Sequence, residues 1–365
     1  MRRLRRWLAG CLGVLALAGC GAPPPLRIGF VAELSGRSSD LGESARNGFL
    51  LDLDDSRRRG VPARPVEVLM RDVGAGPEAA RQSVQELVAG GVDVVVGPMT
   101  SAMVDVVQPI TEPAGVLMIS PTASAAKYRG KDDLLFRINW TTREDASHYA
   151  EYYWTSGVRR VAVAVNGDNR AFSESWLEEF SKTFEALGGK VLTTQTFKSN
   201  SVGYEAVCRP LVATRPDAVV LIANAVDSAR LAQQVRKLAP EMPLIAAEWA
   251  GASQLIELGG RAVEGLRLGQ NYDHGDTSPR FTAFREAYQL RYGKMPAFGA
   301  VLGYDTATVL LEALDRRTPS MSVKDALLRF GPYPGLQQQV VFDANGDAER
   351  AIYFMVVRDG RFVAE

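Results

Sequence analysis

The apolar positions of this chain fall into short, almost continuous runs, separated by stretches in which apolar residues recur about every three to four positions. Strands are expected at residues 27–31, 66–71, 92–96 and 116–119. Helices are expected at residues 42–54 and 77–89, and a short one begins with Ser101 and Ala102. Short apolar runs without alternation are typical of strands that are buried on both faces. The pattern therefore predicts a parallel sheet with helices on both sides.

The same alternation begins again after residue 140. Strands are expected at residues 158–165, 190–197 and 216–223, and helices at residues 173–187 and 204–213. The two series match element by element, so we expect an internal duplication of one open α/β lobe. A third section adds a strand at residues 265–270, helices at residues 279–292 and 300–314, and tail strands at residues 340–343, 351–357 and 362–363.

Two such lobes would hold a ligand in the cleft between them, because open parallel sheets bind ligands at the carboxyl ends of their strands. The stretch 92–125 fits this role, since two strand ends run into hydroxyl side chains at Thr100 and Ser101 and between Ser120 and Ser124. Free backbone N–H groups at a helix start favour a small anion such as a carboxylate. No nucleophile with its base is present there, so the stretch predicts binding rather than catalysis.

Composition and charge exclude several classes of protein. At 365 residues, with 46% apolar and 23% charged residues, the chain is neither disordered nor a multispan membrane protein. The formal net charge is zero, but four of the 42 basic residues are arginines in the first six positions. Without these four, the chain has 38 basic and 42 acidic residues, which gives a net charge of −4. A mildly acidic body without a basic stripe argues against a nucleic-acid partner.

The N-terminus has the features of a bacterial secretory signal. Residues 1–19 combine a basic start with an apolar core that is too short to span a bilayer. The ending LAGC resembles the bacterial lipobox, which implies cleavage before Cys20 and acylation of that cysteine. The alternative is an ordinary cleavage site with a chance cysteine. We expect residues 20–25 to form a lipidated tether that anchors the protein on the extracytoplasmic (periplasmic) side of a bacterial membrane.

The remaining candidate motifs are explained more simply by structure. With Cys11 in the signal and Cys20 acylated, Cys208 has no disulfide partner, and we expect a buried small apolar residue rather than a reactive thiol. The sequence GAGPEA at 74–79 resembles a dinucleotide loop but begins a helix with proline. The sequence DANGD at 343–347 lacks the later glycine and glutamate of a calcium loop. The two histidines lie far apart in sequence, so we expect no metal and no cofactor.

Four blocks of the chain resemble the leucine/isoleucine/valine-binding family of periplasmic solute-binding proteins, the receptors of amino-acid ABC transporters. They are residues 28–48 (IGFVAELSGRSSDLGESARNG), residues 97–121 (with GPMTS and MISP), Phe136-Arg137, and residues 342–362 (FDANGDAERAIYFMVVRDGRF). Each block is weak alone, but together and in order they span nearly the whole mature chain.

The resemblance implies the type I periplasmic binding fold, in which two similar open parallel-sheet α/β lobes are joined by a hinge of three crossovers. We expect an N-terminal lobe of residues 26–141 plus 271–331 and a C-terminal lobe of residues 142–270 plus 332–365. A hinge of several segments would let the cleft close on a ligand.

The resemblance also assigns residues to the two charged ends of a bound amino acid. Ser101 stands where the family binds the α-carboxylate, and Thr122 where a backbone carbonyl accepts from the ammonium group. Ser124 stands where the family contacts both ends. Glu248, at the end of a second-lobe strand, falls on the acidic residue that pairs with the ammonium group. Without the family, both serines would be interpreted as helix caps and Glu248 as a solvated acid.

Other positions are expected to form the wall of the cleft. Phe172 and Tyr304 stand at positions where the family has aromatic residues. Leu41 replaces an aromatic residue, and Trp249 stands where the family often has glycine. Together with Trp140, these residues would favour an apolar or aromatic ligand side chain, whereas the alternative for each tryptophan is a place in the core.

The sequence thus predicts a monomeric, lipid-anchored receptor that delivers an amino acid (branched-chain, apolar or aromatic) or a related small molecule to an ABC permease. The alternative is a sensor of the same fold that binds amino acids or amides without transport. No feature of the sequence supports an enzyme. Ligand binding is expected to stabilise the closed form, because only that form supplies every contact.

Overall fold

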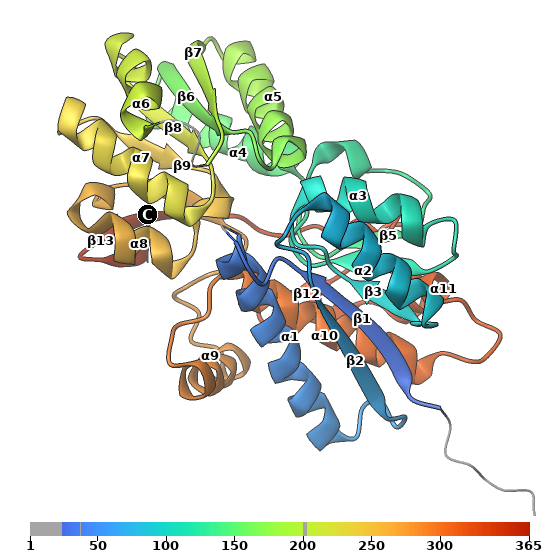
Figure 1. The fold of residues 1–365 in the computed structure, drawn as a ribbon. Helices are drawn as coiled ribbons and strands as arrows, with labels where there is room; N and C mark the ends of the chain where they lie inside the picture. Colours follow the sequence, from blue (N-terminus) through green and yellow to red (C-terminus); the bar gives the residue numbers. More distant parts are fainter. Residues whose placement is uncertain (1–23, 37, 200–202) are drawn as a thin grey trace, which may run out of the picture.

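The computed structural model describes residues 24–36, 38–199 and 203–365. The predicted signal segment and Cys20 therefore lie outside the described residues. Figure 1 shows two α/β lobes, each built around its own sheet. The predicted fold class, two similar lobes with parallel sheets, is confirmed.

The first lobe contains a five-stranded parallel sheet with the order β2-β1-β3-β4-β5. Its strands are β1 (Leu26–Ala32), β2 (Val66–Asp72), β3 (Val94–Val96), β4 (Leu117–Ser120) and β5 (Leu135–Arg137). The connecting segments include α1 (Ser39–Arg59), α2 (Pro77–Ala89), α3 (Ser101–Thr111) and the 3-10 turn η1 (Ala126–Tyr128). β3 and β4 are buried along their whole length, as expected for strands covered on both faces.

The second lobe contains a seven-stranded sheet with the order β14-β13-β10-β9-β8-β6-β7. Its strands are β6 (Arg160–Asn166), β7 (Lys190–Phe197), β8 (Ala218–Ile222), β9 (Leu244–Ala246), β10 (Arg267–Gln270), β13 (Tyr353–Arg358) and β14 (Arg361–Ala364). Its helices are α4 (Thr142–Thr155), α5 (Arg170–Ala186), α6 (Tyr204–Ala213), α7 (Ala225–Leu238) and α8 (Ser253–Gly259), with the 3-10 turns η2 (Glu248–Ala250) and η3 (Gly260–Val263). The five strands β6 to β10 are parallel and repeat the order of the first sheet, which agrees with a duplicated lobe. β13 and β14 add an antiparallel edge.

The chain passes between the lobes three times. It leaves the first lobe after β5, returns after β10 and leaves again before β13. Between the last two crossings it forms α9 (Pro279–Tyr292), α10 (Phe298–Arg316), α11 (Val323–Phe330), β11 (Tyr333–Pro334) and β12 (Gln339–Val340). Because α9 and α10 pack against α1, this late section belongs to the first lobe.

The third crossing comes later in the chain than residue 331, where the N-terminal lobe was predicted to end. β11 packs on α10, and Asp347 forms an ion pair with Arg137 at the end of β5. The rings of Phe136 and Phe342 lie 5.0 Å apart. Residues 333–348 therefore lie with the first lobe, and the predicted strand at 340–343 is only the short β12. The apolar pattern of the tail does not reveal with which lobe residues 333–348 pack, because the buried ion pair between Asp347 and Arg137 decides this.

Two glycines allow α1 and α10 to lie in backbone contact. A Cβ atom on Gly48 would lie 1.9 Å from the carbonyl oxygen of Ala300, and one on Gly303 would lie 2.2 Å from that of Ala45. α10 is buried along nearly its whole length. This close pair brings the first turns of both helices to the boundary between the lobes, where they help to form the cleft.

Candidate functional site

A small cavity lies between the lobes at the carboxyl ends of strands from both sheets. It is lined by Leu41, Met99, Ser101, Thr122, Ser124, Asn139, Asn169, Phe172, Glu248, Trp249 and Phe298. The free volume is about 20 Å³, little more than one water molecule requires. The two lobes thus lie close around the cavity. Of the nine residues predicted to contact the ligand or to form the wall, seven line it, and Tyr304 and Trp140 do not.

On the first lobe, Ser101 and the loop after β4 form a polar cradle. The Oγ atom of Ser101 accepts hydrogen bonds from the backbone N–H groups of Ser124 and Ala125, both at 3.2 Å. The hydroxyl proton of Ser101 is therefore left to donate to a ligand. The helix cap of α3 is Thr100, whose Oγ1 accepts from the N–H of Met103 at 3.4 Å. The alternative that Ser101 is only a cap is therefore wrong.

Two further side chains of the cradle have polar groups at the cavity. The Oγ atom of Ser124 is buried and has no hydrogen-bond partner among the described residues. The Oδ1 atom of Asn139 is likewise buried without a partner there, while its Nδ2 donates to the carbonyl of Thr122 at 3.4 Å. A buried polar atom without a partner is costly, so Oδ1 of Asn139 favours a ligand donor, and the hydroxyl of Ser124 favours a ligand group that can either donate or accept.

On the second lobe, Glu248 is the charged group of the cavity. It follows β9 in the turn η2, and only 2% of its surface is exposed. Its Oε2 atom accepts from the indole N–H of Trp176 at 3.0 Å, whereas Oε1 has no partner among the described residues. Burial raises the pKa of Glu248 to about 7. The interpretation of Glu248 as a solvated acid is therefore wrong.

A second buried carboxylate, Asp145, lies near Glu248. Asp145 is in the first turn of α4 and accepts from Nδ2 of Asn271 at 3.2 Å through Oδ1. Burial, and after it the negative charge of Glu248, raise the pKa of Asp145 well above its usual value. Within the ranges that the structure describes, no lysine or arginine forms an ion pair with either acid. Two close buried carboxylates without a cation favour a positively charged ligand group or a shared proton.

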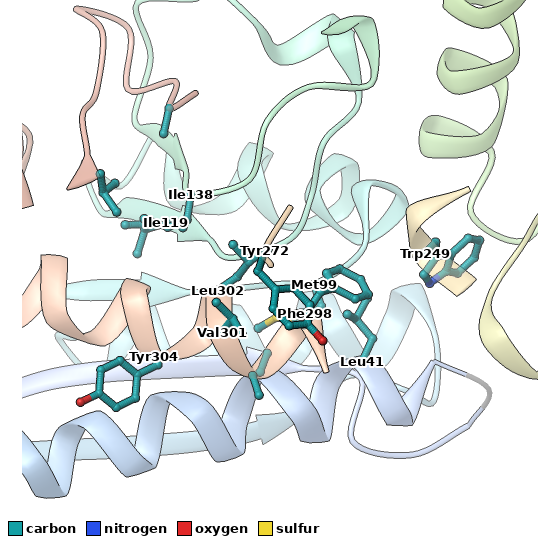
Figure 2. Close-up of a cluster of buried hydrophobic side chains, with 14 of the residues drawn as sticks. Leu41, Met99, Ile119, Ile138, Trp249, Tyr272, Phe298, Val301, Leu302 and Tyr304 are labelled. Atoms are coloured by element: carbon teal, nitrogen blue, oxygen red, sulfur yellow. The ribbon is translucent and has the colours of Figure 1, made fainter. Parts of the chain in front are cut away.

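Apolar side chains form the rest of the cavity wall. Leu41, Met99 and Phe298 come from the first lobe, and Figure 2 shows them grouped together with Trp249 of the second lobe set apart from them. The rings of Trp249 and Phe172 meet edge to face at 5.5 Å. The indole N–H of Trp249 is buried without a partner in the described part of the chain. The cavity thus combines apolar walls with a few polar atoms, as ligand sites do.

Asn169 connects the two lobes beside the cavity. Its Oδ1 atom accepts a hydrogen bond of 3.0 Å from the backbone N–H of Ala102 in the first turn of α3. Ser175 of α5 makes a second link, since its Oγ accepts from the N–H of Ala126 at 3.1 Å. These contacts hold α3 and η1 of the first lobe against the start of α5 across the lobe boundary.

The predictions that Tyr304 and Trp140 line the cleft are both wrong, because neither side chain lies at the cavity. The hydroxyl of Tyr304 donates to Oδ2 of Asp55 at 2.9 Å, and Figure 2 shows the ring at the far end of the cluster from Leu41 and Phe298. Tyr304 lies six residues after Phe298 on α10, so the helix carries it away from the cavity. Trp140 lies with its ring 5.2 Å from that of His148 and does not line the cavity.

Sequence reasoning missed four lining residues: Met99, Asn139, Asn169 and Phe298. Each of them follows a strand or begins a helix, the places where open α/β sheets bind ligands. Asn139 and Asn169 could have been found by this rule, because they follow β5 and β6. In the sequence, Asp145 has the position of an acid that stabilises a helix start, so its proximity to Glu248 could not be predicted.

The family comparison explains why these residues meet between two lobes. A family model described as periplasmic binding protein matches residues 25–361. The chain belongs to the periplasmic binding protein family. One similar protein is the leucine-, isoleucine-, valine-, threonine- and alanine-binding protein of Pseudomonas aeruginosa. It is 22% identical over 358 residues, and the match covers 95% of this chain and 94% of that protein.

Two solved structures show how similar this periplasmic binding protein is to others. The leucine-binding protein LivK of Thermotoga maritima has a TM-score of 0.86 and 25% identity, with 93% of this chain and 97% of that chain covered. An ABC-transporter solute-binding protein of R. palustris in complex with benzoate has the same TM-score at 18% identity, with 93% and 95% covered, and shows the fold alone. These relatives are binding proteins rather than enzymes, and the family implies an extracytoplasmic location.

Other features of this family member concern membranes, metals and the cysteine of the described residues. Across residues 24–36, 38–199 and 203–365, no helix is long and apolar enough to cross a membrane, and no group of three metal-ligating side chains is found. Cys208 is buried, its Sγ lies 3.6 Å from the carbonyl oxygen of Leu231, and burial raises its pKa to about 12. It is therefore a small core residue, as predicted, and not a reactive thiol.

Proposed function

We propose that this protein is a lipid-anchored receptor that binds an α-amino acid between its lobes and delivers it to an ABC permease. The observation that carries the proposal is Glu248, a buried carboxylate at the cavity whose Oε1 has no partner among the described residues. A ligand ammonium group would supply that partner, and hydrogen bonds to charged groups contribute about 1.5–3 kcal/mol each. The Pseudomonas aeruginosa relative is named for binding five amino acids, which supports this ligand class.

The ligand carboxylate would face the first lobe. There the hydroxyl proton of Ser101 is available, and the N-terminal end of α3 favours an anion. Ser124 Oγ can serve either end of the ligand. Because the partners of the two charges belong to different lobes, one amino acid bridges both lobes. Its binding therefore stabilises the closed arrangement of the lobes over an open one.

The side chain of the ligand would pack against Leu41, Met99 and Phe298 on one side and Phe172 and Trp249 on the other. These walls favour an apolar side chain. The free volume of about 20 Å³ is too small for any amino acid, so the lobes must stand further apart when the ligand enters, and the walls rather than the volume select its side chain. We therefore place leucine, isoleucine, valine and alanine first among the candidates.

A thermal-shift screen tests this function with matched ligands. L-amino acids are compared with leucinamide, which lacks the carboxylate, and 4-methylvalerate, which lacks the ammonium group. At a concentration of 100 times Kd, the preferred amino acid should raise Tm by about 5 °C. Neither analogue should shift Tm at the same concentration. A shift of the same size with 4-methylvalerate would contradict the ammonium contact to Glu248.

Affinity for the amino acid should fall with falling pH. Burial holds the pKa of Glu248 near 7 in the ligand-free protein, while a bound ammonium group favours the ionised carboxylate. Binding must then displace a proton below that pH, so Kd should rise about tenfold between pH 8 and pH 6. Calorimetric titrations at several pH values measure this. In Glu248→Gln, which cannot ionise, this dependence should disappear except for any part that arises from Asp145.

The same groups predict how the ligand-free protein responds to pH. The pKa values of Glu248 and Asp145 are raised in the folded state, so the folded protein binds more protons than the unfolded chain. Its free energy of unfolding should therefore fall as pH rises from about 4.5 to about 7. Urea titrations without ligand measure this fall, and a rise across the same range would count against the buried, unpaired state of the two acids.

Lipid anchoring is tested through Cys20. Cys20→Ala removes the acylated side chain, so most of the protein should move from the membrane fraction to the soluble fraction. Cys208→Ala is the matched control and should leave the protein in the membrane fraction. If Cys20→Ala remains with the membranes, the lipobox interpretation is wrong, while the proposed ligand site is unaffected.

A further inference from the structure

A second and much larger cavity lies on the lobe boundary, away from the amino-acid site. Its volume is about 600 Å³, and it shares no lining residue with the first cavity. One side is formed by α8 and the start of β14 in the second lobe, and the other by α9 and residues 295–297 of the first lobe. Figure 1 shows α8 and α9 on the same side of the molecule, one in each lobe.

The walls of this cavity are mainly apolar and aromatic. They include Ile256, Tyr272, Phe281, Met295, Pro296 and Phe362. Met295 is 52% exposed, which is high for a large apolar side chain, and it lies at this cavity. A space of this size with aromatic walls is typical of sites for small organic molecules.

A buried polar atom at this cavity, Nε2 of His274, lacks a partner among the described residues. The hydroxyl of Tyr272 donates to the carbonyl of Pro296 at 3.3 Å and lies 3.4 Å from Nδ1 of His274. We assign the tautomer in which the hydroxyl gives its one proton to Pro296, so that Nδ1 carries the hydrogen of the imidazole and Nε2 is an acceptor.

The ring of His274 is held in place by two aromatic neighbours. It stacks on Tyr272 at 4.2 Å between ring centroids, and Phe362 lies 5.4 Å away on β14. Burial lowers the pKa of His274 to about 4, so the ring is neutral at pH 7. A neutral, fixed imidazole accepts a hydrogen bond from an N–H or O–H group of a ligand.

The charged side chains of the cavity favour an anion. The charged residues that line the cavity are two arginines, Arg285 and Arg361, and one acid, Glu257. In the described ranges, neither arginine forms an ion pair within 4 Å, although both lie at the cavity. The net charge of these three side chains is +1. An arginine without an acidic partner at the rim of an apolar cavity suits a carboxylate.

We propose that this cavity is a second ligand site, for an aromatic or apolar carboxylic acid that also carries an N–H or O–H donor. The apolar body lies between α8 and α9, the donor bonds Nε2 of His274, and the carboxylate meets Arg285 and Arg361. Because both lobes form the walls, a molecule bound here contacts both sides of the lobe boundary. The residues that line this site are separate from those of the first cavity.

Calorimetric titration with two matched probes tests the proposal. Indole-3-acetate carries the N–H donor, and 1-benzothiophene-3-acetate has nearly the same shape but sulfur in its place. The protein should bind indole-3-acetate saturably with one site, and the benzothiophene about five- to tenfold more weakly. In His274→Phe, which keeps the aromatic stack but not the acceptor, the two probes should bind equally.

Two further variants locate the probes. Met295→Trp should weaken both probes at least tenfold by filling the cavity, and Arg361→Gln should weaken both by removing a charge partner. Glu248→Gln, a change in the other site, should leave indole-3-acetate binding unchanged. The proposal is overturned if indole-3-acetate shows no saturable binding, if both probes bind the unmodified protein equally, or if Glu248→Gln abolishes binding while Met295→Trp does not.

Discussion

Replacing Glu248 with glutamine should lower the affinity for the preferred amino acid at least about thirtyfold at pH 8. Removing one partner of a buried, hydrogen-bonded charge pair costs about 2–5 kcal/mol of binding free energy, because the ligand ammonium group would be left buried without its counter-charge. Glutamine keeps the size of the side chain and can still accept from Trp176, so the change isolates the charge.

The same substitution should not destabilise the ligand-free protein at pH 8. The carboxylate of Glu248 is buried near Asp145 with no cation beside it, so its charge is unfavourable until a ligand binds. Calorimetry should thus show weaker binding, while urea denaturation shows an unchanged or higher midpoint. Glu241→Ala, an exposed acid of the same lobe, is the matched control and should change neither quantity. Equal affinities of the variant and the parent protein would contradict the role of Glu248.

Replacing Asp305 with alanine should destabilise the fold by about 3–5 kcal/mol. Asp305 is fully buried, and its Oδ2 lies 2.7 Å from Nη1 of Arg350, whose side chain is 1% exposed. Its Oδ1 accepts from the N–H of Leu336 at 2.7 Å. The guanidinium of Arg350 also donates to the carbonyl of Ile138 at 3.1 Å, so the pair fixes α10 to two of the three crossings. Without Asp305 a charged guanidinium remains buried and unpaired.

A matched surface pair provides the control for Asp305. Arg170 and Glu174 form an ion pair in α5 with side chains that are 69% and 54% exposed, and Glu174→Ala should cost less than about 0.5 kcal/mol. The double change Asp305→Leu with Arg350→Met should recover most of the loss, because an apolar pair of similar size needs no counter-charge. The midpoint and slope of urea denaturation measure all three. Similar losses in Asp305→Ala and Glu174→Ala would show that burial of this pair does not matter.

The sheets could be predicted from the sequence because their central strands are buried on both faces. Runs such as Val94–Val96 and Ala218–Ile222 are apolar at every position and need no knowledge of their neighbours. α7 was not predicted because small residues, including Ala225, Ala229 and Ala232, give its buried face a weak apolar pattern. β9 was expected only as the strand that ends before Glu248, without bounds of its own, because its three residues form too short an apolar run.

The site could be predicted only where family positions and local rules agreed. Ser101 and Ser124 follow adjacent strands, so their meeting in the first lobe is a consequence of the sheet order. Tyr304 was misplaced because it lies on α10, whose first residue, Phe298, lines the cavity, whereas Tyr304 follows six residues later and lies away from it. The partner of Arg350 in that same motif is Asp305, which is structural. Contacts between lobes, such as that of Ala102 with Asn169, depend on how the lobes face each other, which no local pattern encodes.

The most direct test of the central claim is a crystal structure of the protein with the L-amino acid that gives the largest thermal shift. The amino acid should lie between the lobes, with its ammonium nitrogen about 3 Å from Oε1 of Glu248 and its carboxylate within hydrogen-bond distance of the Ser101 hydroxyl. A ligand bound in the reverse direction, or outside the cavity formed by both lobes, would contradict the account, as would the failure of every L-amino acid to bind.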